Sequence, residues 1–286
     1  MEKLSNELSD MYGAQLTPHV RKLGEIQAVG FSGSFIDDAF VPEQDGLLTR
    51  FSRLLGELLL EPETRGGLLL PAYADSEKEK LLEQIRGRVN EKRSYSLLRM
   101  LELMCCYEDY ATPALGMEEE AESIHYQKLT RRYKQLLSQS PIELFYCGSA
   151  EPERVGDILG EVLLNLPRGE ICDELGTDIR MNAVEEQPRV FTEEMDVTQG
   201  KLAVGFRLGD CMEDPNIPAI RVFNAVYGGC LSSKLFMNVR EKLSLAYYAS
   251  SGVDVHKGLL YVSSGIEFEK YDPALTEILA QLEKAR

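Results

Sequence analysis

Histidine is scarce in this sequence and tryptophan is absent: the 286 residues include three His and no Trp. The three, His19, His125 and His256, lie far apart, and none has a second His four residues further on. That spacing places two imidazoles on one face of a helix, where both can bind one zinc ion. A helical two-histidine zinc site is therefore excluded, and we expect each His to be a surface or structural residue.

Two other signatures are also missing: the G-x-x-x-x-G-K-[ST] loop that binds phosphate and the G-x-S-x-G turn of serine hydrolases. Basic residues are in deficit, since 31 Lys and Arg oppose 47 Asp and Glu, a net charge of −16. Such a chain repels polyanions, so we expect no nucleic-acid partner. No apolar run approaches the ~18 residues of a membrane helix, and the charged start MEKLSNELSD is no secretory signal, so we expect no membrane partner.

The cysteines show no metal or redox spacing, because no two of them form a C-x-x-C pair. Free thiols scattered in this way are typical of a protein in a reducing compartment. We therefore predict buried free thiols and a cytoplasmic protein. The six are Cys105, Cys106, Cys147, Cys172, Cys211 and Cys230.

Hydrophobic periodicity divides the chain into strands and helices. In the first part it predicts strands over 22–32 and 142–147, the second of them buried, and helices over 45–60, 75–89, 94–106, 123–138 and 151–164. Residues 167–187 are polar and without a period, which indicates a domain boundary. We divide the chain there into a first domain, 1–172, and a second, 173–286.

The second domain repeats the mixture of strands and helices. A strand is predicted over 201–207, helices over 217–227, 232–242 and 272–284, and a hairpin of strands 245–255 and 259–268. The elements do not alternate strictly as βαβ, and the hairpin is antiparallel. Both features favour an α+β fold over a doubly wound α/β fold.

One ordered motif goes beyond composition and periodicity. The segment GGCLSSKLF at residues 228–236 is followed by VREKLSLAY at residues 239–247. Together they resemble the second-domain signature of the M16 metallopeptidases, the insulinase and processing-peptidase family, in which Gly-Gly-x-x-Ser-Ser-x-Leu-Phe precedes Arg-Glu-Lys-x-Gly-Leu-Ala-Tyr. Ser244 departs from the pattern, which often has Gly there, a change that we expect to matter little.

The resemblance implies a fold and a chemistry. The fold would be two homologous α/β-sandwich domains of the LuxS/processing-peptidase-like metallohydrolase type, each an antiparallel sheet with helices on one face, which close on each other as a clamshell. Active members bind zinc through His-x-x-Glu-His and a distant Glu in the first domain. Their second domain supplies an Arg and a Tyr that hold the substrate peptide.

Three positions of this chain take these roles by resemblance. Glu77 lies where the third zinc ligand is expected, and Arg240 and Tyr247 lie where the substrate-binding pair is expected. The interpretation of the pair is also physical, because Arg is a fixed cation with directed donors and Tyr is a neutral donor, and both suit a peptide carbonyl. Glu77 cannot hold zinc alone, since a zinc site needs three or four protein ligands. We therefore predict no catalytic residue and no metal site in this chain, with Glu77 a vestige of the family's site.

The missing histidine pair leaves three hypotheses open. Judged from Glu77 and Gly13, the zinc motif would lie just before Met1, so we expect the chain to be truncated there, and also after its last helix. The stretch YGAQLT at residues 12–17 resembles members that have lost the motif. Our first hypothesis is therefore a non-catalytic subunit that holds a peptide with Arg240 and Tyr247, paired with a homologous M16 subunit that carries the zinc. The others are a fragment of an active zinc peptidase and a purely structural peptide-binding scaffold.

Overall fold

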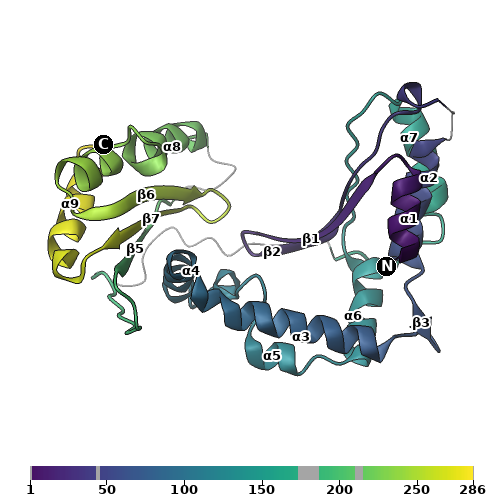
Figure 1. Ribbon diagram of the computed structural model, residues 1–286, viewed down its shortest axis with the longest axis horizontal. Helices are drawn as coiled ribbons and strands as arrows, with labels where there is room; N and C mark the ends of the chain where they lie inside the picture. Colours follow the sequence, from purple (N-terminus) through teal and green to yellow (C-terminus); the bar gives the residue numbers. More distant parts are fainter. Residues whose placement is uncertain (1, 43–45, 173–186, 210–214, 286) are drawn as a thin grey trace. The chain divides into compact units, whose positions relative to one another are not determined.

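The computed structural model describes residues 2–42, 46–172, 187–209 and 215–285 (Figure 1). They form two compact units whose chain segments interleave. Unit 1 comprises Met1–Arg21, Gln27–Leu82 and Glu119–Gly176, and unit 2 comprises Lys22–Ile26, Glu83–Glu118 and Thr177–Arg286. The boundary expected after residue 172 stays a prediction, and next to it lies the segment 173–186, which is outside the described residues.

Unit 1 is mainly helical, and its described residues also form two antiparallel two-stranded sheets. Its core is formed by Met11, Leu47, Phe51 and Leu54, and the Phe51 ring stacks on the Phe35 ring with their centroids 4.7 Å apart. Its elements are α1 (Glu2–Asp10), β1 (Gln15–Leu23), β2 (Ile26–Ser34), α2 (Leu47–Leu60), β3 (Thr64–Arg65), β4 (Leu68–Leu69), most of α3 (Pro71–Gly87), α5 (Glu118–Glu122), α6 (Tyr126–Gln139) and α7 (Pro152–Val162).

Two predicted strands of the first half are wrong in detail. The strand expected over 22–32 is two strands, β1 and β2, because Gly24 has a φ of 61° and turns the chain between them. The run 142–147 was expected to be a buried strand, but it joins no sheet among the described residues, and Phe145 is 93% exposed. The cause of both errors is that periodicity shows which residues are apolar but not which segment pairs with them.

Unit 2 is built on a three-stranded antiparallel sheet with strand order β5-β7-β6, which confirms the predicted α+β class and the predicted hairpin. Its other elements follow along the chain (Figure 1). The bounds are α4 (Lys92–Met104), the short helix η3 (Asp109–Ala111), β5 (Gly200–Arg207), α8 (Ile217–Asn224), the π-helices η4 (Ala225–Gly229) and η5 (Leu235–Lys242), β6 (Ala246–Asp254), β7 (Leu259–Ile266), the short helix η6 (Phe268–Lys270) and α9 (Tyr271–Glu283).

Strand β5 shows that both faces of this sheet are covered. Successive side chains of a strand point to opposite faces. Val204 and Phe206 pack on the core that contains Tyr227, Leu235, Val239 and Ile278, which come from η4, η5 and α9. Gly205 faces the other way, where a Cβ would lie 2.5 Å from the Met104 sulfur and 2.6 Å from the Met100 sulfur of α4. Helix α4 is thus an addition to the predicted one-sided sandwich.

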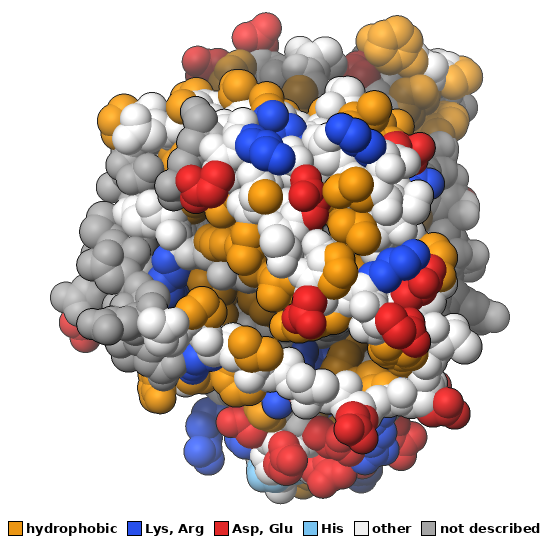
Figure 2. Space-filling model, turned by 90° about the vertical axis from the view of Figure 1, so that its left-hand side faces the viewer, with side chains coloured by type: hydrophobic (Ala, Val, Ile, Leu, Met, Phe, Trp, Pro, Cys, Tyr) orange, Lys and Arg blue, Asp and Glu red, His pale blue; other side chains and the backbone are white. Residues whose placement is uncertain are grey.

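The surface of unit 2 is mixed in character. Figure 2 shows the side of the molecule where α9 lies, and there Lys and Arg side chains are scattered among acidic and apolar ones.

The five cysteines that the structure describes are all free thiols, and Cys211 lies outside the described residues. Only Cys105 of the five is buried, so the expectation of buried thiols is wrong for the other four. No helix within the described ranges is both long and apolar enough to cross a lipid bilayer.

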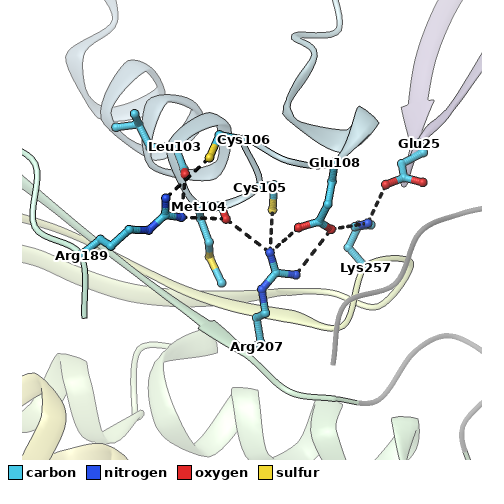
Figure 3. A network of polar contacts seen from close by, with 9 residues as sticks. All are labelled: Glu25, Leu103, Met104, Cys105, Cys106, Glu108, Arg189, Arg207 and Lys257. Atoms are coloured by element: carbon cyan, nitrogen blue, oxygen red, sulfur yellow. Dashed lines mark hydrogen bonds and ion pairs between the residues drawn. The ribbon is translucent and has the colours of Figure 1, made fainter. Parts of the chain in front are cut away.

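A buried network of charges joins separate segments of unit 2 (Figure 3). The Lys257 side chain is 0% exposed, and its Nζ lies 2.7 Å from Glu25 Oε1 and 2.7 Å from Glu108 Oε2. Arg207 forms an ion pair with the same Glu108, and it also donates to the Met104 carbonyl oxygen, 3.3 Å away, at the end of α4. Two cations oppose two carboxylates, so the four side chains have no net charge.

The network stabilises the fold only while all four charged side chains are present. A buried ion pair gains little over apolar side chains of the same shape, but removing one partner leaves a buried charge without compensation. We expect Lys257→Met to lower the free energy of unfolding of unit 2 by about 3–5 kcal/mol, as measured by urea denaturation. The matched control is Lys284→Met, which breaks the Lys284–Glu277 contact of 3.9 Å on the surface of unit 2 and should cost at most about 1 kcal/mol. Equal effects of the two substitutions would contradict this account.

The same network predicts a pH dependence of stability. Burial alone would raise the pKa of Glu108, but its hydrogen bonds with Arg207 and Lys257 bring that pKa below the ordinary 4.5. Burial alone would lower the pKa of Lys257, but its bonds with Glu108 and Glu25 raise that pKa above 10.5. The stability from Glu108 is therefore complete above pH 4.5 and lost as the pH falls through its folded pKa. The stability from Lys257 is complete below pH 10.5 and lost as the pH rises through its folded pKa.

We therefore expect the difference in unfolding free energy between the wild type and Lys257→Met to stay constant across this window. It should shrink when the pH rises above 10.5. Urea titrations at a series of pH values measure it. A difference that keeps growing with alkaline pH would show that Lys257 is not held in its charged form.

Candidate functional site

The signature segment 228–247 begins packed against the core and ends on the surface. Leu235 and Val239 of η5 are fully buried against the sheet. Gly228 is required by close packing, because a Cβ there would lie 2.5 Å from Ser251 Oγ and 2.6 Å from the Ser251 backbone nitrogen of β6. The signature therefore sets how η4 and η5 lie on β6, and so it fixes the positions of Arg240 and Tyr247.

Ser244 ends η5 and turns the chain into β6. Its φ is 49°, in the left-handed region that favours glycine. The Ser244 N–H donates to the Arg240 carbonyl oxygen at 3.1 Å, and the Leu245 N–H donates to the Val239 carbonyl oxygen at 2.9 Å. A helix commonly stops in this way, which explains on physical grounds why the family often has Gly here.

Tyr247 occupies a β-bulge. In the pairing of β6 with β7, Ala246 is opposite Ile266 and Tyr248 is opposite Gly265, so Tyr247 is an extra residue without a partner. A bulge bends the strand and redirects a side chain, and bulges are frequent beside functional sites. The Tyr247 side chain is accordingly on the surface, with 49% of the residue exposed.

Arg240 and Tyr247 line one pocket of about 370 Å³ in unit 2. Sequence reasoning predicted both residues, and the structure brings them to the same depression. Their role in binding a substrate stays a prediction. The lining consists of Arg240, Glu241, Ser244, Leu245, Ala246, Tyr247, Glu267 and Lys270.

Arg240 and Tyr247 make only loose polar contacts within the pocket. Arg240 Nε lies 3.5 Å from Glu241 Oε1, and the guanidinium lies over the Phe236 ring, 4.6 Å from its centroid. The Tyr247 hydroxyl donates to Glu267 Oε1 at 3.4 Å, which is long for a bond between two oxygens. Half-exposed groups in contacts of this length are available to a ligand at small cost.

Sequence reasoning did not find Glu267 and Lys270. They follow β7, and nothing in their own segment points to a pocket. The predicted hairpin could have revealed both residues, because the start of its first strand must lie opposite the end of its second strand. The observed pair Ala246 and Ile266 places Glu267 beside Tyr247 in this way.

The residue at the expected third-ligand position is exposed and paired with a lysine. Glu77 lies on α3, its side chain is 69% exposed, and its carboxylate binds Lys80 Nζ at 2.6 Å. Among the described residues, no three His, Cys, Asp or Glu side chains are grouped so that they could hold a metal ion.

Two of the three histidines bond to other groups in the described structure. His19 Nδ1 is 3.2 Å from Ser32 Oγ in the β1–β2 hairpin, and His125 Nδ1 accepts from the Lys128 N–H at the start of α6. No set of donors within the described ranges therefore fits a zinc site.

Comparison of the whole chain with known proteins agrees with the family resemblance of the signature segment. The family described as "Peptidase M16 inactive domain" matches residues 123–286, which include the pocket. More than half of the chain lies in that match, and the chain belongs to this family.

Individual relatives extend the likeness over nearly all of the chain. The Bacillus subtilis (strain 168) protein named "Probable inactive metalloprotease YmfF" is 32% identical over 281 residues, which are 98% of this chain. A crystal structure of a conserved protein from Enterococcus faecalis V583 has a TM-score of 0.85 at 28% identity over 99% of this chain. The peptidase M16 inactive domain from Pseudomonas fluorescens has a TM-score of 0.77 at 16% identity, also over 99%, and that likeness concerns the fold.

The chain is shorter than each of these relatives. It spans 65% of the length of the Bacillus protein, 66% of the Enterococcus chain and 64% of the Pseudomonas chain.

The turn at Ser244 gives a prediction about stability. The left-handed conformation costs an ordinary residue about 1–2 kcal/mol, while glycine loses about 0.5–1 kcal/mol more than other residues through backbone entropy. We expect Ser244→Gly to raise the free energy of unfolding by about 0.5–1 kcal/mol, as measured by urea denaturation. The control is Ser96→Gly, inside α4, which should lower it by about 0.5 kcal/mol. Destabilisation by both changes would show that the Ser244 turn is not strained.

Proposed function

We propose that this chain is part of a non-catalytic M16 subunit that holds a peptide with Arg240 and Tyr247 while a homologous zinc-bearing subunit cuts it. The observation that carries the proposal is that both residues of the family's substrate-binding pair, Arg240 and Tyr247, line one accessible pocket.

The chemistry of the pair suits the backbone of a peptide. The Arg240 guanidinium is a permanent cation whose N–H groups point in fixed directions, and the Tyr247 hydroxyl is a neutral donor. Both donate to oxygen, which is the only acceptor that every peptide unit offers. A grip on main-chain carbonyl oxygens recognises a peptide with little regard to its side chains, so we propose unfolded or short peptides as the substrate class.

In this proposal the zinc ion is held by the partner. An exposed carboxylate paired with Lys80 provides one oxygen ligand, whereas a zinc site needs three or four protein ligands. The names of the family and of the Bacillus relative, which both contain the word inactive, agree with a subunit that does not cut by itself.

Zinc analysis of the full-length protein tests the division of labour. Purified alone and without chelator, the protein should contain no zinc and should not cleave peptides. Copurified with its zinc-bearing homologue, it should yield zinc together with chelator-sensitive peptidase activity. About one zinc per chain in the protein alone would instead mean that residues beyond this chain supply the ligands and that the parent is itself a zinc peptidase.

Substitutions in the pocket test the grip. Removing a charge-assisted hydrogen bond by Arg240→Ala should weaken peptide binding by about 10- to 100-fold, and Tyr247→Phe by about 2- to 10-fold. Arg221→Ala, an exposed arginine of α8 that does not line the pocket, is the matched control and should bind as the wild type. Unchanged binding in both pocket variants, with partner activity intact, would favour a purely structural scaffold.

A further inference from the structure

Glu267 and Lys270 belong to the pocket but have no part in the grip described above. Glu267 follows β7, and Lys270 ends η6, three residues later. The two form an ion pair with Lys270 Nζ 3.0 Å from Glu267 Oε1. That oxygen is also the one that accepts from the Tyr247 hydroxyl, at 3.4 Å. One carboxylate oxygen is therefore shared by a cation and by a residue of the proposed grip.

We propose that Glu267 acts as an internal competitor that accepts the Tyr247 hydroxyl while the pocket is empty, and that Lys270 weakens this hold so that a peptide carbonyl can replace it. Both are positioning residues in this scheme. The inference rests on the proposed function, because it concerns how the same pocket takes up a peptide.

The competition follows from the chemistry of the hydroxyl. Tyrosine has a single O–H to donate, so a hydroxyl that donates to Glu267 cannot at the same time donate fully to a peptide carbonyl. Bonds between a hydroxyl and a carboxylate are short when strong, about 2.5–2.7 Å. The observed 3.4 Å is a weak hold, which a carbonyl oxygen at ordinary distance would displace.

Lys270 accounts for the weakness of that hold. Its ammonium lies closer to Glu267 Oε1 than the hydroxyl does and neutralises part of the charge that would draw the hydroxyl in. The same ammonium donates to the Ser244 carbonyl oxygen at 3.1 Å, in the turn between Arg240 and Tyr247. Lys270 thus joins the acceptor of Tyr247 to the turn that sets the spacing of the pair.

This arrangement predicts opposite effects from the two halves of one ion pair. Glu267→Gln removes the negative charge from the competing acceptor and should release Tyr247, whereas Lys270→Met leaves the carboxylate free to hold it. An ion pair that only stabilised the fold would give losses of the same sign in both variants. The signs of the two effects on peptide binding therefore distinguish a positioning role from a purely structural one.

The experiment measures binding of an uncharged, end-blocked peptide of Ser, Ala and Gln residues that carries one Trp. Because the chain contains no Trp, indole fluorescence anisotropy reports the peptide alone. We expect Glu267→Gln to tighten binding about three- to fivefold and Lys270→Met to weaken it by a similar factor, with Lys270→Arg close to the wild type. In a Tyr247→Phe background both effects should disappear. Thermal unfolding of each variant checks that it remains folded.

The outcomes distinguish a failure of the role proposed for Glu267 and Lys270 from a failure of the proposed function. Effects of the same sign, no effect, or effects that persist with Phe at position 247 would overturn the role of Glu267 and Lys270. The grip itself would still stand if Arg240→Ala weakened binding by about 10- to 100-fold in the same assay. Wild-type binding in both Arg240→Ala and Tyr247→Phe would overturn the proposed function, and the further inference with it.

Discussion

Lys257 lies in the turn between β6 and β7 with its side chain wholly out of water, and the position of that turn depends on the two carboxylates that bind it. An ammonium buried in this way is tolerated only with close partners, so Glu25 and Glu108 must be in place for the turn to adopt this conformation. The conformation of this turn also fixes the register of the β6–β7 hairpin. A slip of one residue would move the core-facing side chains of the slipped strand to the opposite face, so the core packed on this sheet strongly specifies the register.

The register carries this constraint to the pocket at the other end of the hairpin. With β6 and β7 in the observed pairing, the bulge falls at Tyr247, and the end of β7 places Glu267 beside it. The packing of η5 against the same sheet, through Leu235 and Val239, brings Arg240 to the same depression. The lining of the pocket therefore comes from η5, β6, η6 and the turns beside them, and the loosely paired side chains of Arg240 and Tyr247 are the part left free to bind.

The sequence was sufficient for the outline of this site and insufficient for its working detail. The hairpin and the positions of Arg240 and Tyr247 could be predicted because they depend on alternation and on an ordered motif. The roles of Ser244 and Glu267 could not, since a left-handed φ and a neighbour across a strand are properties of the folded chain. In unit 1 the same limit appears at Gly24, where one glycine makes two strands of the single strand expected. It appears again at Phe145, which is apolar but 93% exposed.

The central claim is that Arg240 and Tyr247 bind the main chain of a peptide. The most direct measurement is a crystal structure of the chain with the Trp-bearing peptide bound. The account predicts a peptide carbonyl oxygen within hydrogen-bonding distance of the Arg240 guanidinium or the Tyr247 hydroxyl, with the Tyr247–Glu267 contact lengthened beyond 3.4 Å. A peptide bound elsewhere, with the pocket contacts as they are in the empty protein, would contradict it.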